Sequence, residues 1–132
     1  MNYPSSFGEL SYDDHNKKRF LSVTARLLRA VGKHFSNLLV QVRSNAGGIA
    51  VGGDVYLSIE DEKKQLGVLI TITHTGFGGN RDDGVVGYIQ YRLPDIKGKL
   101  TRIPNLPNRY FSEFNEERIT HIVQDMLAGH PA

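Results

Sequence analysis

The chain contains no cysteine among its 132 residues, and this absence excludes disulfide bonds, thiolate metal sites and cysteine nucleophiles together. It also has no apolar run near the roughly 20 residues that a membrane-spanning helix needs. Residues 1–14 lack both the basic leader and the apolar core of an export signal. We therefore expect a cytoplasmic protein that is neither exported nor embedded in a membrane.

The sequence motifs of common enzymes are missing as well. There is no GxxxxGK[ST] or GxGxxG phosphate loop, no HExxH, calcium-loop or paired-histidine metal spacing, and no serine elbow. Gly76–Gly79 is rich in glycine, but a strand pattern follows it where a phosphate loop requires a helix N-terminus. We therefore predict that the chain is not an enzyme, binds no metal and needs no cofactor.

Length and composition favour one folded domain. Hydrophobic residues make up 39% of the chain and charged residues 23%, which is ordinary for a globular protein. A chain of 132 residues is close to the usual size of one domain and can bury roughly two-thirds of its unfolded surface. We expect residues 1–132 to form a single α+β domain.

The clearest local pattern is a predicted hairpin in residues 65–93. Its first arm alternates, with aliphatic side chains at Leu66, Val68, Ile70 and Ile72. Its second arm, which ends at Leu93, alternates in the same way. Residues 76–84 between the arms are rich in Gly, Asn and Asp, which accept tight-turn backbone. Such one-sided alternation is typical of an antiparallel sheet with one face on the core and the other toward water.

Further strands are predicted on both sides of the hairpin. Alternating residues indicate strands at 38–43, where Val40 points inward, and at 49–59. A charged turn at 61–64 leads from the second of these into the hairpin. A lysine-bearing edge strand is predicted at 99–103, where positive charge would discourage pairing with another chain. Short connections between strands favour an antiparallel meander of four or five strands in sequence order.

A helix is predicted at each end of the meander. The first runs from about Asp14 to Ser36, and the second lies between an N-cap at Asn115 and an end at Gly129. The core side of the first helix contains Phe20, Val23, Leu27, Leu28, Val31 and Phe35. Because each helix must bury an apolar stripe, we predict that both pack on the one apolar face of the sheet.

The opposite side of the first helix carries a row of basic residues that we call the cationic stripe, and its members are Arg19, Arg26, Arg29 and Lys33. No acidic residue occurs between Asp14 and Asp54, so these like charges repel one another without local compensation. We predict that the cationic stripe binds an anionic partner, and a solvated helix face is the alternative interpretation.

The polar face of the sheet is a second predicted binding surface. The side chains expected on it with binding potential are Arg43, Tyr56, Tyr88 and Arg92, together with the smaller polar residues Ser58, Thr71, Thr73 and Gln90. Tyrosines beside arginines can stack bases and hold phosphates. However, the element order differs from that of the common RNA-recognition sheet, and tyrosine and threonine are also ordinary strand residues. A structural role is the favoured interpretation of this face.

Three hypotheses for function follow. The first is a non-enzymatic binding module that acts through a protein partner, as an accessory or inhibitory protein. The second is a nucleic-acid-binding protein that uses the cationic stripe, with mostly sequence-independent affinity. The third is a small enzyme centred on the loop with His74, Arg81, Asp82 and Asp83. An uncovered sheet edge would also permit a homodimer.

Overall fold

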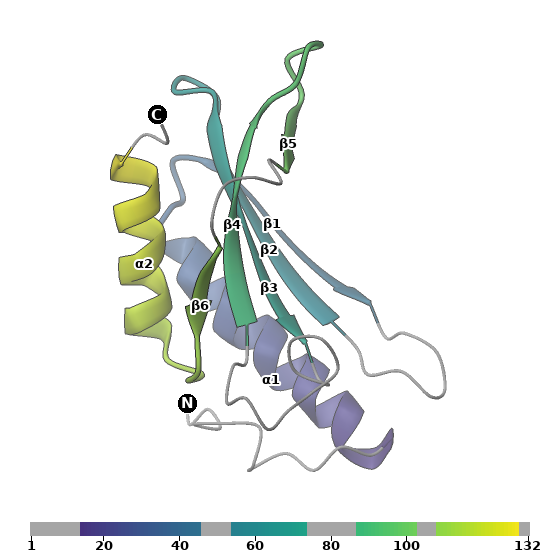
Figure 1. Ribbon diagram of the computed structural model, residues 1–132. Coiled ribbons are helices and arrows are strands. Elements are labelled where there is room, and N and C mark those ends of the chain that lie inside the picture. Colours follow the sequence, from purple (N-terminus) through teal and green to yellow (C-terminus); the bar gives the residue numbers. More distant parts are fainter. Residues whose placement is uncertain (1–13, 46–53, 74–86, 103–107, 130–132) are drawn as a thin grey trace.

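The computed structural model describes residues 14–45, 54–73, 87–102 and 108–129, which fold as one α+β unit. In chain order its elements are α1 (Asp14–Lys33), β1 (Leu39–Asn45), β2 (Asp54–Asp61), β3 (Leu66–Thr73), β4 (Gly87–Pro94), β5 (Leu100–Arg102), β6 (Arg109–Phe111) and α2 (Glu116–Ala128) (Figure 1). The predicted order of helix, antiparallel meander and helix is confirmed. The predicted strand residues 49–53 and the loop 76–84 lie outside the described residues.

Strands β1 to β4 lie side by side in sequence order, and every pairing is antiparallel. The turn between β2 and β3 sets their register. Its last residue, Gln65, has a φ of 52°, and the Gln65 Nε2 donates to the carbonyl oxygen of Glu62 at 2.7 Å. The Lys64 backbone N–H donates to Asp61 Oδ1 at 3.2 Å. The charged turn predicted at 61–64 is therefore present and closed by its own polar groups.

Two short strands share the other side of β4. β5 pairs with the end of β4, where Arg92 lies opposite Arg102, and β6 pairs with its start, where Ile89 lies opposite Arg109. Two residues of β4 separate these pairings, whereas six residues, 103–108, connect the short strands. The two strands therefore act as one interrupted fifth strand. β5 lies within the edge strand predicted at 99–103 but contains no lysine, because Lys99 directly precedes it, and the sequence patterns did not predict β6.

Both helices lie on one face of the sheet, as predicted. In Figure 1, α1 crosses behind the strands and α2 stands to their left. α1 contacts β1 and β2, whereas α2 contacts β3 and α1. The buried core between the helices and the sheet includes Phe20, Leu27, Leu28, Val31, Val55, Leu57, Ile59, Val68, Ile70, Ile72 and Ile89. The ring of Phe20 meets the ring of Phe114 edge to face at 6.2 Å, which joins α1 to the segment that precedes α2.

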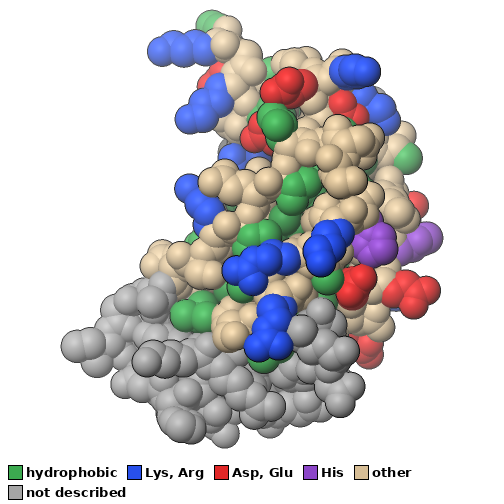
Figure 2. All heavy atoms as spheres, turned by 180° about the vertical axis from the view of Figure 1, so that it is seen from behind, with side chains coloured by type: hydrophobic (Ala, Val, Ile, Leu, Met, Phe, Trp, Pro, Cys, Tyr) green, Lys and Arg blue, Asp and Glu red, His purple; other side chains and the backbone are tan. Residues whose placement is uncertain are grey.

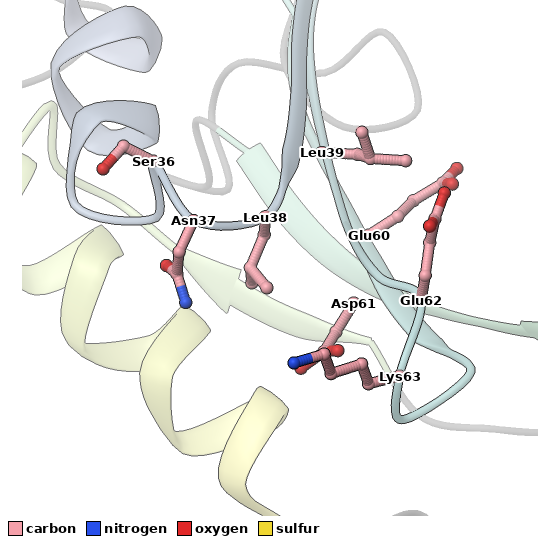
Figure 3. Close-up of a pocket in the computed structure, with 8 residues that line it drawn as sticks. All are labelled: Ser36, Asn37, Leu38, Leu39, Glu60, Asp61, Glu62 and Lys63. Carbon is pink, nitrogen blue, oxygen red and sulfur yellow. The ribbon is translucent and has the colours of Figure 1, made fainter.

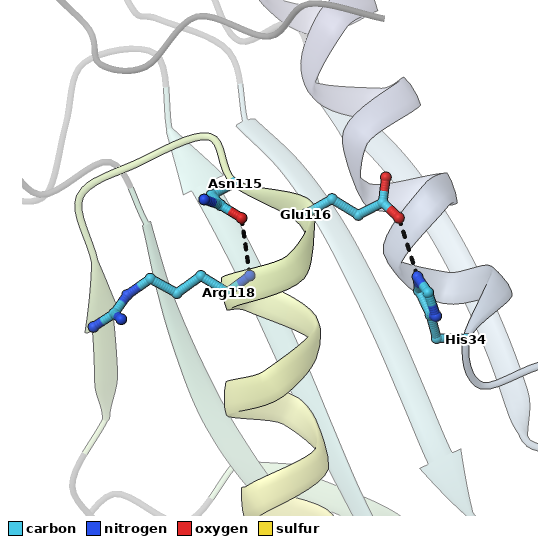
Figure 4. Close-up of polar contacts among 4 residues, drawn as sticks. All are labelled: His34, Asn115, Glu116 and Arg118. Atoms are coloured by element: carbon cyan, nitrogen blue, oxygen red, sulfur yellow. Dashed lines mark hydrogen bonds and ion pairs between the residues drawn. The ribbon is translucent and has the colours of Figure 1, made fainter.

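Both ends of α2 are fixed by specific hydrogen bonds. At its start, the Asn115 side chain accepts a hydrogen bond from the Arg118 N–H at 3.0 Å, as the predicted N-cap requires (Figure 4). Beside it, His34 Nε2 lies 3.0 Å from Glu116 Oε2, so that the end of α1 is linked to the start of α2. Gly129 is the C-cap, as predicted, and its φ of −90° is one that any residue can adopt.

The inward position predicted for Val40 is only partly correct. Its side chain is 37% exposed, although it contacts α1. The contact is with Gly32, where an added Cβ would lie 2.8 Å from Val40 Cγ1. Because glycine has no side chain to cover its neighbour, and because β1 lies at the edge of the sheet, much of Val40 stays accessible.

Candidate binding surfaces

The strand register places five side chains in one line across the face of the sheet that the helices do not cover. Arg43 lies opposite Tyr56, Tyr56 opposite Thr71, Thr71 opposite Tyr88, and Tyr88 opposite Tyr110. We call this line the tyrosine row. It crosses β1, β2, β3, β4 and β6, so five strands hold it in place. Side chains in cross-strand register are close neighbours, and the row is therefore one continuous surface feature.

The tyrosine row unites three of the four residues predicted for this face and adds one that was not predicted. Arg43 is exposed, Tyr56 and Tyr88 are half-buried, and the additional Tyr110 is 47% exposed. The rings of Tyr88 and Tyr110 lie 6.3 Å apart at an angle of 50°. The fourth predicted residue, Arg92, lies on the same face but four residues along β4 from Tyr88. There it is opposite Gly67 on one side and Arg102 on the other.

Two residues expected to be exposed on this face are buried instead. Thr71 is 3% exposed and Gln90 is 8% exposed. Thr71 lies between Tyr56 and Tyr88 in the register, and two large rings beside a small side chain leave it little accessible surface. The centre of this face is consequently packed, and its accessible groups are the larger side chains around Thr71.

The carboxylate of Asp54 lies beside the tyrosine row. The Tyr56 hydroxyl donates to Asp54 Oδ2 at 3.1 Å. Burial raises the pKa of Asp54 above its ordinary value, and the hydrogen bond from Tyr56 acts in the opposite direction. Burial also raises the pKa of Tyr56, as do the charge of Asp54, the hydrogen bond to it and the nearby Tyr88, whereas Arg43 lowers it. Tyr56 is therefore held as a neutral hydrogen-bond donor beside an acid.

The cationic stripe lies on the opposite side of the molecule from the tyrosine row, because α1 packs on the other face of the sheet. Arg26, Arg29 and Lys33 are all exposed. Figure 2 looks at the side on which α1 lies and shows Lys and Arg side chains gathered across its middle. Arg19 belongs to α1, but its side chain is outside the described part of the structure. The two predicted binding surfaces are thus separate, and no single flat ligand can contact both.

One pocket of about 420 Å³ lies between the turn that precedes β1 and the turn between β2 and β3 (Figure 3). It is lined by Ser36, Asn37, Leu38, Leu39, Glu60, Asp61, Glu62 and Lys63. In Figure 3 the Glu60 and Glu62 side chains point together toward the side of Leu39, whereas Asp61 and Lys63 point the other way. Only two of its three acids point to one side, and they are not part of a group of three metal-ligand side chains within the described residues.

Two further pockets have mixed charge. One of about 470 Å³ at the start of α2 is lined by Arg109, Glu113, Asn115, Glu117, Arg118, His121 and Ile122. The other, of about 630 Å³, lies beside the β4–β5 hairpin and is lined by Glu60, Glu62, Gln65, Arg92, Gly98, Lys99 and Leu100. No hydrogen bond or ion pair between side chains is found within either lining.

The loop of the enzyme hypothesis, with His74, Arg81, Asp82 and Asp83, lies outside the described residues. Across residues 14–45, 54–73, 87–102 and 108–129, no three His, Asp or Glu side chains are grouped as metal ligands. In the same ranges, neither helix has the length and apolar character needed to cross a membrane. Comparison of the chain with known protein families, with curated proteins and with solved structures finds no match in any of the three.

Proposed function

We propose that this chain is a non-enzymatic binding protein that docks another protein on the outer face of its sheet. The observation that supports this proposal is the tyrosine row, which is held in register by five strands on the face away from both helices. Sheet strands fix the direction of each side chain, so the row is preorganised for binding and loses little freedom on contact.

The residue types of the tyrosine row are those that dominate protein interfaces. Tyrosine and arginine are enriched among the residues that contribute most to protein–protein affinity. Tyrosine provides a large contact area with only two rotatable side-chain bonds, so ordering it costs little entropy. Tyr110, at the β6 end of the row, is 47% exposed, so about half of its side chain is available to a partner.

The charges around the tyrosine row favour a protein over a nucleic acid. Arg43 and Arg92 are accompanied by Asp54 and Glu60, whose carboxylates lie on the same face of β2. A nucleic acid would bring phosphates toward these acids, and like charges at an interface oppose binding. A protein surface with both signs of charge can match such a mixed pattern.

Photo-crosslinking from position 110 tests the proposal. A photo-reactive amino acid in place of Tyr110, which is 47% exposed, is compared with the same amino acid in place of Gln124, which is exposed on α2. After irradiation in a cell lysate, we expect a protein adduct at position 110 that resists nuclease and is absent at position 124. Absence of any adduct above the control, or an adduct that nuclease removes, contradicts the proposal.

The crosslinked protein is then purified and its affinity for the chain is measured by calorimetry. We expect Tyr110→Ala and Arg43→Ala each to weaken binding by about 10-fold or more, because interface centres concentrate affinity in such residues. Gln124→Ala is the matched control and should leave the affinity unchanged. Equal affinity for all three variants would show that the tyrosine row is not the docking surface.

A second candidate function is nucleic-acid binding by the cationic stripe. It is favoured by the exposure of Arg26, Arg29 and Lys33 on one helix whose only acidic residue is Asp14. Fluorescence anisotropy with labelled single-stranded DNA, duplex DNA and RNA tests it at low and at physiological salt. Binding that weakens steeply with salt and disappears in the Arg26→Glu/Arg29→Glu variant would support this candidate, because phosphate contacts release counterions. No binding at low salt would eliminate it.

A further inference from the structure

We propose that the edge strand β1 accepts an extended acidic segment of the partner protein as an additional strand of the sheet. This inference rests on the protein-binding function proposed above and specifies the chemistry of the partner. It arises from a difference between the two edges of the sheet and from the charges that border one of them.

Among the described residues, β1 is an edge strand with few of the usual protective features. It pairs with β2 over all seven of its residues without a bulge, and no other described strand pairs with it. Six of its side chains are exposed and only Val42 is half-buried, with Leu39 reaching 53% exposure. Proteins protect free edges with charged side chains, lysine above all, with proline, with inward-pointing charge or with bulges. The β1 sequence LVQVRSN has one charged residue, Arg43, and contains no lysine, proline or acid.

The other edge of the sheet is built differently. There β5 and β6 are only three residues long each and are interrupted by residues 103–108. Lys97 and Lys99 lie in the hairpin that leads into β5, and both are exposed. Short and broken edges offer few backbone groups to a partner strand, whatever the charge of that strand. The sheet thus has one guarded edge and one that can pair, which is the arrangement expected if a partner strand docks on β1.

Basic residues border β1 on the helix side. Gly32 of α1 sits against Val40, so this flank of the helix faces β1. Arg29, three residues earlier, is displaced from Gly32 by about 60° around the helix, and Lys33 is its neighbour one turn later. Both side chains are exposed, and neither has a hydrogen bond or ion pair with the described residues. Arg29 is therefore the nearer of the two to the space that an added strand would occupy, and Lys33, about 100° around the helix from Gly32, lies farther toward solvent.

A basic residue also borders β1 on the outer face, because Arg43 is exposed at the start of the tyrosine row. An added strand would direct alternate side chains toward the helix side and toward the outer face. Acidic residues of one alternation would face Arg29 and Lys33, and those of the other would face Arg43. Glu60 lies opposite Leu39, and Glu62 points to the same side (Figure 3). We therefore place an acid of the partner segment beside Arg43, away from Glu60 at one end of β1, whereas Asp54, opposite Asn45 at the other end, already accepts the Tyr56 hydroxyl.

A second copy of this chain fits the same edge less well. Pairing of β1 with β1 of another copy would bring two sets of Arg29, Lys33 and Arg43 to one seam. β1 contains no acid that could compensate them. Like charges placed together at an interface oppose association. An acidic segment of a different protein is accordingly the occupant that the charges favour.

The test uses labelled nine-residue peptides, with binding followed by fluorescence anisotropy and by hydrogen exchange of residues 39–45. The first peptide alternates valine and glutamate, and the second alternates valine and lysine. Two further versions of the glutamate peptide carry N-methyl groups on one or the other set of alternate residues. Each version has lost the backbone N–H donors along one of the two edges of the peptide strand. We expect the glutamate peptide to bind and to slow exchange in β1, and the lysine peptide to bind at least 10-fold more weakly.

One of the two N-methylated peptides should also lose at least 10-fold in affinity, because it cannot donate the ladder hydrogen bonds. Arg43→Glu and Arg29→Glu/Lys33→Glu should each weaken the glutamate peptide severalfold, whereas Lys97→Glu is the control with the same change of charge on the guarded edge. Equal binding of both N-methylated peptides, or of the lysine peptide, overturns the inference. The inference is also overturned if light scattering detects a dimer of this chain and residues of β1 are protected from hydrogen exchange in that dimer.

The two proposals fail in different ways. If the crosslink at position 110 forms but the glutamate peptide does not bind, the docking function stands and strand addition on β1 is wrong. If the crosslink is absent and the peptide does not bind, both proposals are wrong. Strand addition is supported only when the peptide protects residues 39–45 and the N-methyl effect depends on which residues carry the methyl groups.

Discussion

The hydroxyl of Tyr91 lies 3.0 Å from the carbonyl oxygen of Met126, so that strand β4 holds the last turn of α2. The same hydroxyl lies 3.2 Å from the carbonyl oxygen of Gly129, and Lys64 Nζ donates to the carbonyl of Leu127 at 3.2 Å. The last carbonyls of a helix have no partner within the helix. Lys64 donates to one of these carbonyls and the single Tyr91 O–H is shared between Met126 and Gly129, so that both side chains fasten the end of α2 to the sheet.

Tyr91→Phe should lower the free energy of unfolding by about 1 kcal/mol, because it removes one hydroxyl donor from partly buried carbonyls. Urea denaturation followed by circular dichroism measures this change. Tyr110→Phe is the control, since its side chain is 47% exposed and its hydroxyl accepts from Asn108 Nδ2 at a long 3.5 Å. A loss for Tyr91→Phe no larger than that of the control would show that the hydroxyl does not fasten α2.

Gly87→Ala should destabilise the fold by about 1–3 kcal/mol, the usual cost of adding a methyl group to a packed interior. A Cβ at this position would lie 2.5 Å from Phe111 Cζ and 2.5 Å from the backbone oxygen of Thr71. The ring can move, but the strand backbone cannot without loss of pairing. Gly129→Ala is the control, because an added Cβ there would come no closer than 3.3 Å to Asp125 O. Equal midpoints in urea for the two variants would contradict this prediction.

Asn115→Ala should cost about 1 kcal/mol, because it removes the side-chain acceptor that caps the Arg118 N–H at the start of α2. The change is measured as a lower midpoint of thermal unfolding. Gln124→Ala places the same residue type at an exposed position within the helix, where alanine is the best helix former. The variant at position 124 should be neutral or slightly more stable, and a similar loss at both positions would argue against the cap.

Asp54→Asn should change how stability depends on pH. Because burial raises the pKa of Asp54 above its ordinary value of 3.8, the folded chain keeps a proton on this carboxyl where the unfolded chain has lost it. The contribution of Asp54 to the free energy of unfolding therefore falls as the pH rises from 3.8 through the raised pKa. The variant lacks this titration, and its amide oxygen can still accept from Tyr56.

Chemical denaturation at several pH values between 3 and 6 measures the effect. We expect the stability of Asp54→Asn relative to the wild type to increase with pH over this interval, by a small amount because the carboxyl is only partly buried. Asp125→Asn, at an exposed position on α2, is the matched control. A relative stability that decreases with rising pH would mean that Asp54 is stabilised in its charged form.

The fold could be predicted where local patterns were long and regular. The alternation of β3 is confirmed, and so is the apolar stripe of α1 except for Val23, which is half-buried and lies outside the core cluster. The N-cap at Asn115 and the end at Gly129 are confirmed for the same reason, since capping depends on neighbours in the sequence. Local chemistry thus determined the elements and their order.

The candidate site could be predicted only in part, because its geometry comes from pairing between distant strands. Tyr110 was missed since β6 is three residues long and is defined by its register with β4. The alternation of Arg109, Tyr110 and Phe111 was a signal, but it is too short to indicate a strand alone. The burial of Thr71 likewise depends on Tyr56 and Tyr88, which lie on neighbouring strands.

The packing of α2 on β3 also bears on how the chain matures during synthesis. β3, at residues 66–73, leaves the ribosome well before α2, at residues 116–128. Until α2 arrives, one part of the inner sheet face, with Val68 and Ile70, lacks its cover, although both side chains are fully buried in the finished fold. Exposed apolar strands in a nascent chain attract chaperones and other unfolded chains. A chain in which α2 has not yet formed would therefore expose part of the inner sheet face to other unfolded chains.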